Sequence, residues 1–449
     1  MSAKDRAANT YAARRERLMQ QLHASTSGVA LKKNSSNLFR DRNRAGKPRL
    51  DVRDFCHILQ VDPQSGWADA EGMTSYEKIV LATLACGVMP TVVPQLKTIT
   101  LGGAIAGVGI EASSFRLGLV HHGVLEMDIL AGDGKIYLCT PQNEHRDLFF
   151  GFPNSYGTLG YALRVRAKTV PVKNFVRIEY SRFDEPAAYF RSLLALCESS
   201  ADFVDGVIFG PQELYLAAAT FVDEAPHVSD YTFEHIYYRS IREKTTDYLT
   251  THDYLWRWDT DWFWCSKNFG VQNPIVRRLA GKERLNSRTY TKVMRWNSRW
   301  KLTQRLDALL RVRRESVIQD VDIPITRAAE FLAFFEREIG ILPVWICPIR
   351  SPDTRVFPLY PLNPATTYVN FGFWEVVKSD KAQLAGHYNR LIERKVAELG
   401  GIKSLYSDSY YSRPEFDALY GAQAYRELKA RYDPQNRLHD LYDKCVLRK

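Results

Sequence analysis

Alternating apolar and polar positions predict strands in the first half of the chain. Residues 161–171, YALRVRAKTVP, alternate apolar and basic side chains, which is typical of an antiparallel strand with one face in water. Two further alternating runs flank a turn at Gly132–Gly134, and this arrangement predicts a β-hairpin. From about Leu31 to Pro171 the pattern therefore indicates short strands interspersed with helices.

A helical pattern precedes these strands, with Thr74 as a candidate N-cap. The apolar residues that recur on one face of this helix are Tyr76, Ile79, Val80 and Leu84. The uncharged run 79–96 is just long enough to span a membrane, but one glycine and two prolines interrupt it. We therefore predict a helix that ends near Cys86, and no transmembrane helix.

The second half of the chain mixes strand and helix patterns with many aromatic residues. Apolar runs predict strands at residues 205–210, 315–324, 342–349 and 367–373, and helical spacing predicts helices at 327–338 and 381–399. A last helix should stop at Asp433–Pro434, because proline disfavours helix at the residue before it. This mixture predicts an α+β fold.

Length and charge narrow the class of protein. The chain has 449 residues and is 45% hydrophobic, which suits a globular protein of two or three domains. A net charge of +10 favours anionic partners, and the densest basic stretches are residues 40–49 and 311–314. No nucleic-acid-binding motif accompanies them, so we expect no nucleic-acid partner.

Cysteine usage indicates a reducing compartment. The seven cysteines are scattered and form neither a CxxC motif nor a Cys/His cluster, so we expect free thiols and no metal site. Residues 1–25 are charged and lack the apolar stretch of a signal peptide, which predicts a short solvated helix. The expected location is cytoplasmic, at the inner face of the membrane if the protein contacts one.

The segment from Thr98 to Gly118, TITLGGAIAGVGIEASSFRLG, is rich in glycine but lacks the GxGxxG dinucleotide motif. An irregular glycine-rich backbone can expose successive N–H groups that bind a pyrophosphate. A tight chain crossing in a crowded core explains the same glycines equally well. Upstream, LKKNSSNLFR (31–40) combines lysines with small polar side chains, and it is either a phosphate-binding loop or an exposed turn.

Several motifs in order resemble one family. They are GVMPTVVPQLKTITLGGAIAGVGIEASSFRLGL, RDLFFGFPNSYGTLGYALRVRAKTVP, VIQDVDIPI, ILPVWICPI, LYSDSYYSRPEF and YDPQNRLHDLYDK. The chain from about residue 30 onward resembles the FAD-dependent delta-24-sterol reductase-like branch of the vanillyl-alcohol oxidase/PCMH flavoprotein superfamily. That branch includes bacterial flavoproteins that act on methylated fatty acyl chains.

The resemblance implies the domain organisation. Residues 1–25 would be an N-terminal charged helix, 26–172 a two-part PCMH-type FAD-binding domain, 173–405 an α+β substrate cap, and 406–449 a C-terminal segment that returns to the FAD domain. We expect no N-terminal membrane anchor of the kind found in the sterol enzymes.

The resemblance also implies the cofactor site, in which the glycines let the backbone approach FAD. The implied cofactor-binding residues are Ser35, Ser36, Asn37, Pro94, Gln95, Thr98, Thr100, Leu101, Gly102, Gly103, Gly107, Gly109, Ile110, Glu111, Ser113, Ser114, Gly157, Leu159 and Gly160. Relatives that attach FAD covalently often use a histidine in the first phosphate loop. None is present in KKNSSN, so we expect non-covalent FAD.

The implied chemistry acts on a carbon–carbon double bond of a hydrophobic lipid, either a sterol side chain or a methylene-branched fatty acyl chain. Reduction needs a hydride from flavin and a proton from the protein, with NADPH as the expected donor. The alternatives are a fatty-acyl desaturase, a carbohydrate-type flavin oxidase and a non-catalytic lipid-binding protein. The catalytic candidates are Tyr406, Asp408, Tyr410 and Glu111, with Asp320 and His122 as further proton carriers.

The tryptophan-rich segment 254–265, YLWRWDTDWFWC, interleaves aromatic and charged residues. Aromatic side chains usually pack in a core. Charges at every second or third position, however, favour a rim that docks on anionic phospholipid. The sequence therefore predicts a possible peripheral membrane contact at this segment.

Overall fold

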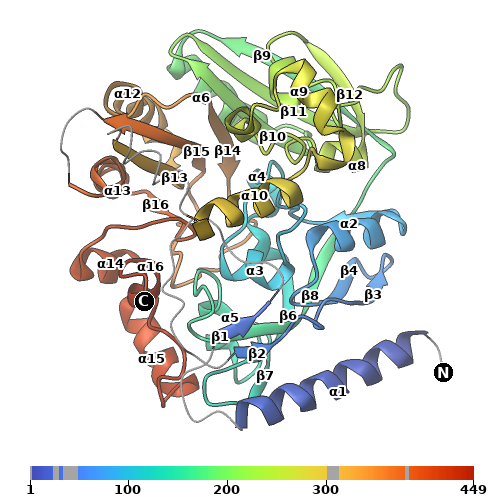
Figure 1. Cartoon of the computed structure of the whole chain (residues 1–449), viewed down its shortest axis with the longest axis vertical. Helices are drawn as coiled ribbons and strands as arrows, with labels where there is room; N and C mark the ends of the chain where they lie inside the picture. Colours follow the sequence, from blue (N-terminus) through green and yellow to red (C-terminus); the bar gives the residue numbers. More distant parts are fainter. Residues whose placement is uncertain (1–2, 24–29, 34–48, 301–312, 380–383) are drawn as a thin grey trace.

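The computed structural model describes residues 3–23, 30–33, 49–300, 313–379 and 384–449. Two β-sheets divide it into a lower half, formed mainly by the first part of the chain, and an upper half (Figure 1). Helices and antiparallel strands alternate throughout, so the predicted α+β class is confirmed.

The first sheet has six strands. In order they are β3 (Ile58–Asp62), β4 (Trp67–Glu71), β8 (Tyr161–Pro171), β6 (Val124–Leu130) and β7 (Ile136–Cys139), with β5 (Val88–Pro90) also paired to β8. The predicted strand 161–171 and the hairpin at Gly132–Gly134 are both confirmed. A separate parallel pair joins β1 (Ala30–Lys32) to β2 (Arg49–Asp51).

The second sheet has eight strands. In order they are β12 (Thr246–Thr250), β9 (Phe175–Phe183), β11 (Glu213–Val222), β10 (Phe203–Gly210), β14 (Val344–Ile349), β15 (Tyr368–Ser379), β13 (Arg313–Pro324) and β16 (Ile402–Lys403). The four strands predicted from apolar runs lie here, as β10, β13, β14 and β15.

Helices surround both sheets. They are α1 (Ala3–His23), α2 (Tyr76–Leu84), α3 (Leu101–Ala106), α4 (Ser114–Leu117), α5 (Arg146–Gly151), α6 (Pro186–Cys197), α7 (Tyr237–Ser240), α8 (Thr251–Leu255), α9 (Pro274–Ala280), α10 (Ser287–Trp300), α12 (Ala328–Glu338), α13 (His387–Glu398), α14 (Arg413–Leu419), α15 (Ala422–Tyr432) and α16 (Leu441–Cys445). Residues 79–96 hold the end of α2 and then β5, and within the described ranges no helix combines the length and apolarity that crossing a bilayer requires.

Three sequence-based details need correction. The N-cap of α2 is Ser75, because the Thr74 hydroxyl instead donates to the His57 carbonyl at 3.2 Å. Helix α13 begins at His387 rather than 381, since Gly386 before it has a φ of 75°. Helix α1 is not merely solvated: Leu18 is buried, and the guanidinium of its neighbour Arg14 donates to Glu71.

Alternation along β13 and β15 gives the second sheet two different faces. Val317, Val321, Val369, Phe371 and Phe373 pack in one core with residues of α6, α12 and α13. The intervening positions, Asp320, Asp322, Asn370 and Trp374, therefore lie on the opposite face, which we call the inner face. Trp345 and Ile349 of the inner face share a core with Leu101 and Ile105, so this face lies against the glycine-rich segment.

The C-terminal segment contacts the first-sheet half. The Asp133 amide donates to the Tyr432 carbonyl at 2.9 Å, and the Lys429 ammonium donates to the Thr158 carbonyl at 3.0 Å. Figure 1 shows α15 in red beside α5.

Candidate functional site

Backbones approach each other closely at the start of the glycine-rich segment. The amides of Leu101 and Gly102 donate to the carbonyls of Thr74 and Gly72, each at 2.9 Å. A Cβ at residue 102 would lie 3.1 Å from the Gly72 oxygen, and a Cβ at residue 72 would lie 1.9 Å from the Ala162 oxygen. Glycine at both positions thus lets α3 contact β8.

The later glycines also face protein atoms. A Cβ at Gly107 would lie 3.0 Å from the Gly103 oxygen, and one at Gly109 would lie 2.9 Å from Val120. The Gly109 amide donates to the Ala104 carbonyl. The expectation of an irregular run of exposed amides is therefore wrong in part: the segment contains a short helix, and several amides are already bonded. A tight chain crossing accounts for these glycines.

Replacing Gly72 by alanine tests this explanation. The new Cβ would meet a rigid backbone carbonyl, so the free energy of unfolding should fall by about 1–3 kcal/mol. Chemical denaturation of the variant measures the loss. The control is Gly210→Ala, whose Cβ would meet only Glu213 at 3.9 Å and should change stability by less than about 0.5 kcal/mol. Equal stabilities of the two variants would contradict the packing explanation.

A buried carboxyl and a phenol meet on the inner face. Burial raises the pKa of Asp320 to about 7, although a hydrogen bond with Tyr406 acts in the opposite direction. Burial likewise raises the pKa of Tyr406 well above its usual range, so its hydroxyl stays protonated. The Trp374 indole donates to the Tyr406 oxygen at 2.9 Å and orients it. Asp320, Tyr406 and Trp374 therefore form a half-buried group that can hold a proton near neutral pH.

A second carboxyl lies two residues along the same strand. Asp322 accepts hydrogen bonds from the Tyr360 hydroxyl at 2.6 Å and from the Asn370 amide at 2.8 Å. Burial raises its pKa to about 6, against the lowering effect of these two donors.

Tyr156 links the glycine-rich segment to this face. Its amide donates to the Ala106 carbonyl at 3.2 Å, and its hydroxyl donates to the Gly107 carbonyl at 3.5 Å. It is also close enough to raise the pKa values of Tyr406 and Tyr360 electrostatically. The predicted catalytic residue Tyr406 and the predicted cofactor segment are thus brought together.

A buried ion cluster joins the two halves of the molecule. Arg257 donates to Glu111 at 3.1 Å and to Asp205 at 2.8 Å, and all three side chains are at most 3% exposed. The Trp345 indole donates to Asp205 at 3.2 Å. Burial raises the pKa of Glu111 to about 7, although Arg257 lowers it. Glu111 therefore holds the glycine-rich segment to the second sheet.

Buried polar atoms without a protein partner mark where a polar ligand fits. They include both amide atoms of Gln95, Glu111 Oε2, His121 Nδ1, Asn154 Oδ1, Ser155 Oγ, Ser407 Oγ and Ser409 Oγ. Leaving such atoms unpaired is costly, so a bound ligand or ordered water normally satisfies them. Gln95, Glu111, Asn154, Ser155, Ser407 and Ser409 lie in the three segments that the sequence nominated for FAD and catalysis, and further such atoms of the described residues lie elsewhere in the molecule.

Three of the candidate proton carriers have structural partners instead. Asp408 pairs with Arg448 at 3.3 Å, and the same guanidinium donates to the Tyr410 hydroxyl at 2.9 Å. His122 accepts from the Leu119 amide through Nδ1, and burial lowers its pKa to about 4. The structure thus brings Tyr406 and Asp320 together, but not Asp408 or Tyr410 with them.

The remaining cofactor candidates are mostly buried. The Ser113 hydroxyl donates to the Thr91 carbonyl at 2.8 Å, and the Ser114 hydroxyl accepts from the Glu111 amide. Gly157 and Gly160 have positive φ values of 77° and 147°. Ser35, Ser36 and Asn37 lie outside the described residues.

The predicted membrane rim at residues 254–265 is wrong. Trp256, Trp258, Trp262 and Trp264 are at most 5% exposed. The interleaved charges are compatible with a core because each has a buried partner. Arg257 pairs with Glu111 and Asp205. Asp259 accepts from the Ser287 hydroxyl, and Asp261 pairs with Arg277 at 2.7 Å. Pairing of charges at long sequence separation was not visible in the local pattern.

Sequence reasoning missed Asp205, Arg257 and Trp374 as site residues. Asp205 interrupts the apolar pattern of its strand, and a polar group in such a run is the signal that could have identified it. Nothing in the sequence indicated their partners.

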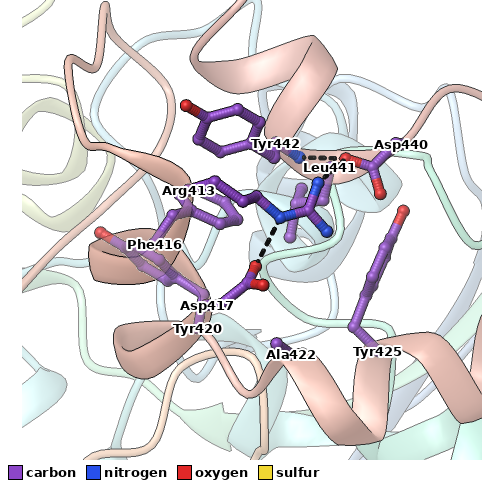
Figure 2. Close-up of a pocket in the computed structure, with 9 residues that line it drawn as sticks. All are labelled: Arg413, Phe416, Asp417, Tyr420, Ala422, Tyr425, Asp440, Leu441 and Tyr442. Carbon is purple, nitrogen blue, oxygen red and sulfur yellow. Dashed lines mark hydrogen bonds and ion pairs between the residues drawn. The ribbon is translucent and has the colours of Figure 1, made fainter.

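A surface pocket on the C-terminal segment lies apart from this site. Figure 2 shows Arg413 between Asp417 and Asp440, with the ring of Tyr442 nearby. The Arg413–Asp417 distance is 2.8 Å, and Arg413–Asp440 is 3.4 Å. The pocket's charges satisfy each other, so it offers no evident ligand site.

Comparison with known proteins supports the resemblance. Residues 17–140 match the FAD binding domain family. The chain is similar to the Delta(24)-sterol reductase of Homo sapiens, at 28% identity over 409 residues, covering 86% of this chain and 75% of the relative. The enzyme of the same name from Pisum sativum is 26% identical over 71% of this chain and 60% of its own length. Cytokinin dehydrogenase 7 of Oryza sativa subsp. japonica matches 32% of this chain and 28% of its own length at 28% identity.

These matches confirm the resemblance to FAD-dependent sterol reductase-like flavoproteins. FAD carries hydroxyls, a diphosphate and a polar ring system, all of which need hydrogen-bonding partners in a buried site. The unpaired atoms of Gln95, Asn154 and Ser155 suit such a ligand. The residues present therefore fit FAD.

Proposed function

We propose that this protein is an FAD-dependent oxidoreductase that reduces a carbon–carbon double bond of a hydrophobic lipid, with NADPH as electron donor. The observation that carries the proposal is the half-buried Asp320–Tyr406–Trp374 group, linked through Tyr156 to the segment nominated for FAD binding. Similarity to sterol reductases supports a sterol side chain as substrate.

The cofactor would be held by the chain's buried polar atoms. Gln95, Asn154 and Ser155 would donate to or accept from FAD, and the predicted loop at Ser35–Asn37 would complete its phosphate contacts. When bound, FAD supplies the hydride transfer.

Aromatic side chains favour an apolar substrate at this face. The Phe263 ring lies 4.3 Å from that of Trp374, and Trp264 lies 5.6 Å from it. An isolated double bond offers no polar group to bind, so its site has to be apolar. A sugar would need an array of hydrogen-bonding side chains instead.

Proton delivery falls to Tyr406. Its neutral hydroxyl is the proton carrier, and Trp374 fixes the position of the oxygen. Asp320, whose pKa is about 7, can return a proton to the phenol. Glu111, Asp408 and Tyr410 are engaged in ion pairs or hydrogen bonds with arginine, which makes them weaker candidates.

Flavin spectroscopy tests the proposal. The purified protein should be yellow, or should become so with added FAD, and anaerobic NADPH should bleach the flavin absorbance. A sterol with an unsaturated side chain should then restore the colour. Bleaching by saturated lipid alone would indicate a desaturase, and bleaching by sugar would indicate an oxidase. Protein that stays colourless with added FAD would refute the proposal.

A further inference from the structure

Gly372 lies in strand β15, which pairs with β13 on one side and β14 on the other (Figure 1). The antiparallel register places it directly opposite Asp320 of β13 and Trp345 of β14. Directly opposite residues of paired strands share a face of the sheet, and so do residues two positions apart on one strand. Gly372 therefore belongs to the inner face, in the row of Asp320 and Trp345 and next to Trp374 of its own strand.

The space over Gly372 is taken by two neighbouring side chains. A Cβ at this position would lie 2.7 Å from Asp320 Oδ1 and 2.7 Å from Trp374 Cη2. Both distances are too short for a carbon atom, so any side chain at residue 372 would displace the carboxyl or the indole. The φ of Gly372 lies outside the left-handed region, so the close approach of these two side chains, and not backbone freedom, is the reason for glycine here.

Both neighbours of Gly372 also contact the Tyr406 hydroxyl. The Trp374 indole donates to the Tyr406 oxygen at 2.9 Å. A hydrogen bond joins Tyr406 to Asp320 as well, and it affects the pKa of each group. The phenol oxygen is thus held between an indole and a carboxyl, and the size of residue 372 limits how closely these two groups approach each other.

Trp374 has little freedom to retreat from a side chain at residue 372. Its ring centroid lies 4.3 Å from that of Phe263 and 5.6 Å from that of Trp264, and both of these residues are at most 8% exposed. Asp320 is less constrained, because its Oδ1 has no hydrogen-bond partner among the residues that the structure describes. The carboxyl would therefore move first, and its hydrogen bond with the phenol would lengthen.

We propose that Gly372 is a positioning residue for proton delivery, because its missing side chain lets Asp320 and Trp374 hold the Tyr406 hydroxyl from two sides. The inference rests on the proposed function, since it concerns the same site. In that reaction the phenol gives its proton to a substrate carbon, and the Asp320 carboxyl then returns a proton to the phenolate. Gly372 takes no part in these bonds and acts only through the placement of its neighbours.

Replacing Gly372 by alanine tests this role in the reaction. Lipid reduction should slow about 10–10²-fold, because a small displacement of an aligned catalytic group costs that much. The KM for the sterol and the affinity for FAD should change less than about threefold, since residue 372 adjoins the proton carriers. The control is Gly210→Ala, a strand glycine of the same sheet whose Cβ would meet only Glu213 at 3.9 Å. Equal rates for the two alanine variants would overturn the proposal.

A double-mutant cycle shows whether Gly372 acts through Asp320. In Asp320→Ala the new methyl group at residue 372 can occupy the volume that the carboxyl leaves. Adding Gly372→Ala to this variant should therefore slow the reaction by less than about a further threefold. Losses that multiply in the double variant would make Gly372 a general packing residue and would overturn the proposal.

A pH titration of the Trp374 indole N–H signal, in protein isotope-labelled at tryptophan, tests the same geometry without turnover. Trp374→Phe identifies the signal. Its titration should have a midpoint at about pH 7, the pKa of Asp320, and Asp320→Asn should abolish it. Tyr406 and Asp322 are the titratable groups that act on this carboxyl, and β15 faces it with Gly372 and Trp374.

In Gly372→Ala the midpoint should rise, because the hydrogen bond with Tyr406 lowers the pKa of Asp320 and is weakened in the variant. Gly210→Ala should leave the midpoint unchanged. An unchanged or lower midpoint in Gly372→Ala would overturn the proposal. A raised midpoint in a protein that binds FAD but reduces no sterol would refute the proposed function alone, and would leave the placement of the three side chains standing.

Discussion

Replacing Arg257 by methionine should lower the free energy of unfolding by about 3–5 kcal/mol, because two buried carboxyl groups lose their counter-charge. Arg257 lowers the pKa of Glu111, so its removal should raise that pKa further. Protonation of Glu111 removes one unpaired charge, so the loss should be smaller at about pH 5 than at about pH 8. Denaturant unfolding at the two pH values measures both effects.

Two further variants show whether the loss of stability in Arg257→Met comes from unpaired buried charge. Arg177→Met removes an exposed ion pair with Glu179 and should change stability by less than about 0.5 kcal/mol. Combining Arg257→Met with Glu111→Gln and Asp205→Asn removes the charges together and should recover much of the loss. A triple variant as unstable as Arg257→Met alone would show that packing, and not charge pairing, dominates at this position.

Replacing Tyr406 by phenylalanine should slow lipid reduction about 10²–10⁴-fold, because the proton carrier is lost while the ring stays in place. FAD binding, followed by absorbance and fluorescence titration, should be unchanged. Tyr442→Phe is the matched control, since it removes a hydroxyl that only donates to the Tyr411 carbonyl. Turnover by Tyr406→Phe at the wild-type rate would assign proton delivery to another group.

The pH dependence gives this assignment a second test. Burial raises the pKa of Asp320 to about 7, so its protonated form prevails below that pH and is lost above it. If Asp320 supplies a proton to the Tyr406 phenol, the rate of lipid reduction should therefore fall as pH rises through about 7. Asp320→Asn should abolish that dependence as well as slow the reaction. An unchanged pH profile in Asp320→Asn would separate the carboxyl from the chemistry.

Local patterns were sufficient to predict several of the longer elements. The strand at 161–171 and the hairpin at Gly132–Gly134 appear where alternation and turn residues placed them. The predicted ends of the elements were less accurate, because they depend on which hydrogen bonds individual side chains form. The Thr74 hydroxyl donates to the His57 carbonyl, and Ser75 is the N-cap of α2.

The candidate site was only partly predictable. The sequence nominated Tyr406, Glu111 and Gln95, and the structure buries Glu111 and Gln95 and half-buries Tyr406. The sequence did not indicate that Asp320 and Tyr406 interact, or that Arg257 bridges Glu111 and Asp205, because these partners are far apart along the chain.

By itself, the sequence determined the α+β class, several long strands and the resemblance to FAD-dependent flavoproteins, since these depend on periodicity and on short motifs read in order. Only the tertiary structure decided which aromatic and charged residues are buried. The tryptophans at 256–264 entered the core because Asp261 and Arg257 found buried partners, while Ile275 and Leu279 remained outside. Burial depends on contacts between distant segments, and no local pattern encodes those contacts.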